Sequence, residues 1–217
     1  GDLLMGQKRF DEYFAKVVLE KCFPEKFIDL QIADKPDLRY GSEIGIEVTN
    51  CMPQEVVEAF NLWHRAAKKG EQTPPRILER LEQLKDTVHL EGSKLIWEQG
   101  SYVEDDIDNS PIKEFVNAVA SKVERLNSAN ANYAEMKSYE LFVNSTIDIS
   151  TFNQIDAMLA RLTELNYKPK KFDNIHLITI NQKLFTFDIA NNTFSIKHLY
   201  THLERMAQIA RNLYKGL

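Results

Sequence analysis

The pattern of apolar and polar positions divides the first quarter of the chain into a helix followed by strands. Five apolar side chains recur at helical spacing between residues 5 and 23 and predict an amphipathic helix there. Alternation of apolar and polar residues over 27–32 predicts a strand, and the more apolar run over 44–48 predicts another. A turn marked by Gly41 separates these two predicted strands.

The same two periodicities continue to the end of the chain. Further helices are predicted over about 53–69, 75–86, 110–126, 151–165 and 196–214. Further strands are predicted over about 88–97, 139–143, 175–180 and 184–189, the last two as a hairpin. Phe194 begins one more short element, and residues 98–111 form an acidic surface loop that lacks the glycine and closing glutamate of a calcium loop.

This order of elements predicts the fold class. Helices and strands are mixed along the chain, without a repeat and without a low-complexity linker. We therefore expect one α/β domain over residues 1–217, in which helices flank a mixed central β-sheet.

Composition restricts the class of protein without changing that fold. Of the 217 residues 43% are hydrophobic and 27% are charged, as in ordinary globular proteins, and no apolar run could span a bilayer, so no membrane partner is expected. The two cysteines, Cys22 and Cys51, have no CxxC spacing and favour free thiols in a reducing, cytoplasmic setting.

Charge is unevenly distributed along the chain. The net charge is −5, yet the segment from Lys168 to the end holds eight Lys or Arg against three acids, which gives +5 there and −10 elsewhere. A basic C-terminal region of this kind can contact phosphates, so nucleic acid is the expected partner. The sequence leaves the oligomeric state open, a homodimer included.

Two acids stand out once the common catalytic motifs are excluded. The chain has no P-loop, no dinucleotide-binding glycine motif, no GxSxG and no HExxH. Asp37 lies at the edge of a predicted strand, and Glu47 lies inside an apolar one, where a charge is costly unless it is compensated. Mg²⁺ or Mn²⁺ would compensate both acids, and the backbone carbonyl of Val48 could supply a third oxygen ligand.

The motif formed by Pro36-Asp37 and Glu47-Val48-Thr49 resembles the core motif of the PD-(D/E)XK, or restriction-endonuclease-like, nuclease superfamily. The resemblance covers residues 8–70 well and 112–143 more loosely. It implies a restriction-endonuclease-like fold and Mg²⁺-dependent cleavage of phosphodiester bonds, in DNA rather than RNA. It also implies that Asp37 and Glu47 are metal ligands and that an acid of the leading helix assists them.

The leading-helix acid is Glu20 or Glu12 in this chain, and a helical wheel favours Glu20, which borders the apolar stripe. Where the family has a lysine, this chain has Thr49, which cannot supply a positive charge. The resemblance allows the lysine to come from another element, and Lys122 is preferred over Lys68 and Lys69 because it borders a buried stripe. The alternative is a catalytically inactive nuclease fold that serves as a binding or assembly module.

Overall fold

The computed structural model describes residues 2–51, 54–92, 94–97, 112–145, 147, 152–179 and 182–216. The chain forms two compact units, one made of residues 1–51 and 104–217 and the other of residues 52–103. Whether the two units fold together as the one domain expected from the sequence stays a prediction. The predicted loop at 98–111, with the predicted start of a helix at Ser110, lies outside the described residues.

The first unit is built on a seven-stranded mixed sheet in the order β1-β2-β3-β6-β7-β8-β9. Its strands are β1 (Gln31–Ile32), β2 (Leu38–Tyr40), β3 (Ile44–Asn50), β6 (Ser138–Asn144), β7 (Phe172–Ile178), β8 (Lys183–Asp188) and β9 (Thr193–His198). Strand β6 runs parallel to both β3 and β7, whereas every other neighbouring pair is antiparallel. The predicted mixed central sheet of an α/β protein is therefore confirmed.

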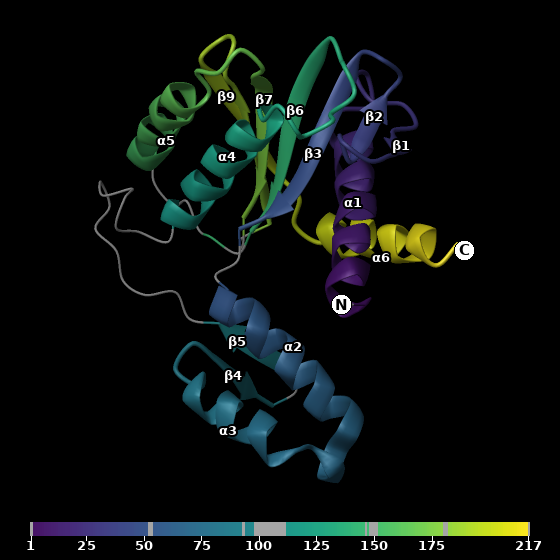
Figure 1. The fold of residues 1–217 in the computed structure, drawn as a ribbon, viewed down its shortest axis with the longest axis vertical. Helices are drawn as coiled ribbons and strands as arrows, with labels where there is room; N and C mark the ends of the chain where they lie inside the picture. The colour runs from purple at the N-terminus through teal and green to yellow at the C-terminus, as the bar shows by residue number, and fades with distance from the viewer. Residues whose placement is uncertain are drawn as a thin grey trace. The chain divides into compact units, whose positions relative to one another are not determined.

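Helices cover both faces of this sheet (Figure 1). They are α1 (Asp2–Cys22), α4 (Ile112–Leu126), α5 (Phe152–Leu165) and α6 (His202–Tyr214). Helices α1 and α6 share one apolar core with Ile46 and Val48 of β3, and α4 and α5 share the other core with Leu141 of β6. Because successive residues of a strand point to opposite faces, Glu47 faces the α4 side while its two neighbours face α1.

Two predicted boundaries are wrong, one of a strand and one of a helix. In both places the backbone changes conformation within the predicted range. The strand expected over 27–32 is reduced to the two residues of β1, because Asp29 has a positive φ of 57° that interrupts extended backbone. The helix expected from residue 196 begins only at His202. Residues before it extend β9, which pairs with β8 along its whole length.

The second unit has its own small core. It contains α2 (Gln54–Lys69), a 3₁₀ turn (Gly70–Gln72), α3 (Pro75–Gln83) and the hairpin of β4 (Val88–Glu91) with β5 (Lys94–Trp97). Val56 and Ala59 of α2 pack there against Leu84 and Val88. None of the described helices in either unit is long and apolar enough to cross a membrane.

Candidate active site

Asp37 and Glu47 lie side by side at the start of β2 and in the middle of β3. Asp37 directly precedes β2, and its Oδ2 accepts a hydrogen bond of 2.8 Å from the backbone N–H of Val48. Only 4% of Asp37 and 3% of Glu47 is exposed, so both carboxylates are held out of water. They lie close together because Asp37 binds the backbone of Val48, the residue that follows Glu47. Such a pair is costly unless positive charge compensates it.

Lys122 of α4 supplies one such charge. Its Nζ lies 3.2 Å from Oε2 of Glu47, and only 15% of the lysine side chain is exposed. Lys122, the lysine preferred from the sequence, thus lies beside one of the two acids within the first unit. Lys68 and Lys69 lie in the last turn of α2, where both are exposed parts of the second unit.

A third buried carboxylate comes from α1, and it belongs to Glu12. Glu12 is 4% exposed and lies close enough to Asp37 for the two charges to repel each other. The preferred Glu20 is placed elsewhere: its Oε1 accepts hydrogen bonds from the backbone N–H of Leu30 and from Lys16. The helical wheel favours Glu20, whereas Glu12 is the acid that lies near Asp37, because α1 is buried on more than one side and its most apolar stripe is not its only inward face.

The crowding of these acids changes their protonation. Burial, then repulsion from Asp37, raises the pKa of Glu12 to about 7, although Arg9 and Lys8 act in the opposite direction. The pKa of Glu47 is also raised, first by burial and then by Asp37, and Lys122 and the Tyr133 hydroxyl oppose that rise. Burial thus disfavours the ionised forms of Glu12 and Glu47, and a bound cation beside them would favour ionisation of both acids.

Two exposed cations of α1 line the rim of the site. Lys8 Nζ lies 3.6 Å from Oδ1 of Asp37, and Arg9 Nη1 lies 3.0 Å from Oε2 of Glu12. Their side chains are 58% and 49% exposed, in contrast to Lys122. Long, exposed side chains of this kind can leave a carboxylate for a phosphate at little cost.

Thr49 and Val48 complete the comparison with the motif. Thr49 is half-buried, and its hydroxyl makes a long hydrogen bond of 3.4 Å to the carbonyl of Asn50. In a strand the N–H and the carbonyl of one residue point to the same side. The Val48 N–H donates to Asp37 on the β2 side of β3, so the Val48 carbonyl also points to that side.

The donors that gather here fit a hard divalent cation. Mg²⁺ is usually held by one or two carboxylates, with the remaining ligands from water and substrate. Asp37, Glu47 and the Val48 carbonyl provide oxygen donors, and both carboxylates are buried. Among the described residues, however, no three His, Cys, Asp or Glu side chains form a complete metal-binding group.

A second buried polar cluster lies on the sheet away from these acids. Glu140 of β6 accepts from His176 Nε2 at 2.7 Å and from Lys26 Nζ at 2.5 Å, and Thr186 lies 2.9 Å from His176 Nδ1. Burial opposes ionisation of Glu140, but its two partners more than offset this, so its pKa lies below the usual value. Every polar group in the cluster has a partner, which is typical of a structural network.

Sequence reasoning missed Tyr133 and the pair at the rim. Tyr133 lies in an irregular segment between α4 and β6, and its hydroxyl hydrogen-bonds Glu47. Burial, then the charge of Glu47, raises the pKa of Tyr133, so the tyrosine stays a hydrogen-bond donor. No periodicity or motif marks Tyr133. Lys8 and Arg9, in contrast, form a basic dipeptide about one helical turn before Glu12, which can be read from the sequence.

Fold and site together define an α/β protein with a seven-stranded mixed sheet and three buried carboxylates beside a lysine. Comparisons of the chain with protein-family models, with curated proteins and with solved structures find no match.

Proposed function

We propose that this chain is a Mg²⁺-dependent phosphodiesterase that cleaves nucleic acid, DNA in preference to RNA, with a restriction-endonuclease-like fold. The observation that carries the proposal is the approach of Lys122 to Glu47 at 3.2 Å. The resemblance needs a lysine beside the two acids, Thr49 removes it from the motif, and α4 supplies one from a different element.

The order of elements supports the same proposal. Helix α1 brings Glu12, β2 follows Asp37, and β3 carries Glu47 antiparallel to β2. Helix α4 then brings Lys122, and β6 returns parallel to β3. This order, including the looser part at 112–143, agrees with the order of elements that the resemblance implies and so supports the proposal.

The residues of the chain would divide the work as follows. Asp37, Glu47 and the Val48 carbonyl would hold Mg²⁺, which when bound activates water and stabilises developing negative charge. Lys122 holds a positive charge beside Glu47, where it can stabilise charge on phosphate oxygens. Glu12, with its pKa near 7, can take up a proton at neutral pH.

The test is cleavage of plasmid and of single-stranded DNA by the Glu47→Gln variant, with Mg²⁺ and with Mn²⁺. We expect cleavage to fall by at least about 100-fold, because an amide oxygen is a weaker ligand for a hard cation. Glu43→Gln is the matched control, since Glu43 is an exposed partner of Lys137. Undiminished cleavage by a folded Glu47→Gln protein would refute the proposal.

The origin of the lysine has its own test in the same assay. Lys122→Met should reduce cleavage about as strongly as Glu47→Gln does, because the positive charge beside Glu47 is lost. Adding Thr49→Lys returns a lysine to the motif position and should restore part of the lost activity. If the double variant is no better than Lys122→Met, the two positions are not equivalent, and the assignment of Lys122 to the role of the motif lysine fails.

A second function is favoured by two observations. Among the described residues no three potential ligands form a complete metal group, and Lys8 already lies beside Asp37. Both facts agree with a catalytically inactive module that binds nucleic acid or assists assembly. Calorimetry separates the two functions, because the inactive module would bind neither Mg²⁺ nor Mn²⁺ and its DNA binding would not change with metal.

A further inference from the structure

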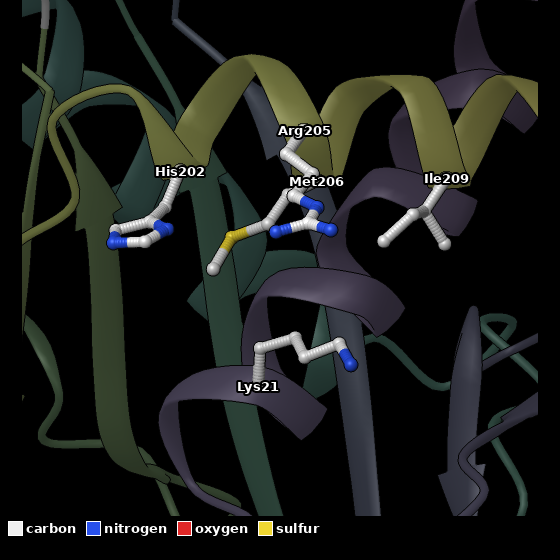
Figure 2. A pocket seen from close by; sticks show the side chains of 5 residues that line it. All are labelled: Lys21, His202, Arg205, Met206 and Ile209. Carbon is white, nitrogen blue, oxygen red and sulfur yellow. The ribbon is translucent and has the colours of Figure 1, made fainter.

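A pocket of about 420 Å³ lies between α1 and α6, on the same sheet face as these helices. Figure 2 shows the side chains of α6 pointing toward α1, on which Lys21 lies across the gap. The pocket is lined by Lys21, His202, Arg205, Met206 and Ile209. Its volume is in the range of small-molecule sites, larger than a single inorganic anion needs.

Positive charge gathers at this pocket without a matching acid. Lys21 and Arg205 are exposed, and within the described part of the chain neither they nor His202 form an ion pair. Lys197 of β9 does not line the pocket and lies instead over the ring of Phe23, with its Nζ 5.1 Å from the ring centre. Like charges around a hollow repel one another, and an anion in the hollow relieves that repulsion.

Some other cations of the C-terminal region, in contrast, form ion pairs. Lys168 and Lys170 are each engaged by an acid, Glu124 and Glu135 respectively. The excess positive charge of the C-terminal region is therefore not spread evenly over the surface. Part of it is used in ion pairs, whereas Arg205 lines the pocket together with Lys21 of α1.

The remaining lining residues favour a ligand that has an apolar part as well as a negative charge. Met206 and Ile209 are half-buried and give the pocket an apolar wall beside the cations. The start of α6 at His202 adds the positive end of a helix dipole, which favours a phosphate group. A phosphate joined to a flat, mainly apolar body would use both halves of the pocket.

We propose that this pocket binds the phosphate and the base or sugar of a nucleotide, either free or within a single strand. Lys21 follows Glu12 by nine residues on α1, which is roughly 14 Å along the axis and half a turn around it. The pocket thus lies on the other side of α1 from the acids. Its ligand binding does not depend on the proposed cleavage and remains testable if the protein cleaves nothing.

The experiment measures binding to the whole chain in EDTA, so that the acidic site contributes no metal. Three probes are used: inorganic phosphate and adenosine monophosphate by calorimetry, and a fluorescein-labelled 12-nucleotide single strand by anisotropy. The test variant is Lys21→Gln combined with Arg205→Gln. Arg211→Gln on the same helix is the matched control, because Arg211 does not line the pocket and its guanidinium bonds Gln208.

We expect the double variant to bind adenosine monophosphate at least about 10-fold more weakly and the control to bind within about 2-fold of the original chain. Strand binding that also weakens, with a salt dependence reduced by about 1.4 in log–log slope, would identify nucleic acid as the source of the phosphate. Mononucleotide binding without strand binding would identify a free nucleotide.

Two outcomes overturn the proposal. One is binding of no probe at all, and the other is equal binding by the double variant and the control when circular dichroism shows both folded. The apolar wall is tested separately by Ile209→Ser, which should weaken binding of the mononucleotide but not of inorganic phosphate. Equal affinity for these two probes in the original chain would also exclude the nucleoside part.

Discussion

At the scale of single residues, the protonation of Glu12 links the acidic site to stability. Its pKa is raised from 4.5 to about 7 by burial and by Asp37, so the folded protein holds this proton more tightly than the unfolded chain does. The unfolding free energy therefore falls as the pH rises from about 4.5 to about 7, and it stays lowered above that range. Without a metal, the site is a source of instability at neutral pH.

Replacing Glu12 by Gln should remove that penalty. We expect the variant to gain about 3 kcal/mol over the original chain at pH 8 and almost nothing at pH 4.5, because the pKa rises from 4.5 to about 7 on folding and each pKa unit corresponds to about 1.4 kcal/mol. Urea denaturation in EDTA at the two pH values measures the difference. A gain of equal size at both would show that Glu12 is not protonated preferentially in the folded protein.

Some of these residues could be predicted from the sequence for a physical reason. Glu47 could be found because a charged residue inside an apolar strand is rare and costly, and Asp37 because it follows Pro36 at the edge of the strand before it. Lys122 could be found because it borders a buried helical stripe. Glu12 and Tyr133 could not be selected, since their burial depends on how α1 and an irregular segment pack against β3, which no local pattern encodes.

At the scale of elements, β3 and the segment before β2 are in unusually close contact. A Cβ atom added to Gly45 would lie 2.5 Å from Cγ of Pro36, 3.0 Å from Met136 and 3.2 Å from the ring of Tyr139. The proline ring cannot move aside as a flexible side chain could. Because Pro36 directly precedes Asp37, the space at Gly45 sets the position of the first acid.

The variant Gly45→Ala should therefore lose about 1–3 kcal/mol of stability through overpacking and also reduce cleavage, since Asp37 is displaced from the Val48 N–H. Gly41→Ala is the control: Gly41 has a φ of 55° and no atom within 4 Å of an added Cβ, so it should lose only about 1 kcal/mol and keep its cleavage rate. Thermal unfolding and the plasmid assay compare them. Equal cleavage by both variants would show that the space at Gly45 does not set the position of Asp37.

Long elements were predictable from sequence and short ones were not. Apart from α6, the helices and the apolar strands β3 and β6 appear close to their predicted positions because each buries a regular face. Strand β2 has only three residues, too few to show a period, so no range was predicted for it, although Asp37 was expected at the edge of a strand. Strand β9 alternates between exposed and half-buried residues and exists because β8 offers it a paired edge.

At the scale of the whole molecule, the two compact units differ in the size of their cores. The described core of residues 52–103 centres on Val56, Ala59, Leu84 and Val88, whereas the first unit has an extensive core on each face of its sheet. Small units bury a lower fraction of their surface and are correspondingly marginal. No shift in composition announced this division, since both units have ordinary amphipathic helices.

We expect hydrogen exchange to resolve the two units. Amides of α2, α3 and the β4–β5 hairpin should exchange at least about 10-fold faster than those of β3, β6 and β7, because the smaller core opens at a lower free energy. Mass spectrometry of peptides after a timed labelling pulse measures this. Uniform protection across both sets would indicate one cooperative domain, as first expected from the sequence.

The place where the second unit enters the chain has a consequence for folding. Glu47 and Lys122 are 75 residues apart, and residues 52–103 make up 52 of those. The entropy of closing a flexible loop grows only with the logarithm of its length, so this long insertion makes the contact about 1 kcal/mol harder to form than a 23-residue connection would. If residues 52–103 fold first, the flexible part of the loop falls toward those 23 residues, and most of that added entropic cost is removed before Lys122 meets Glu47.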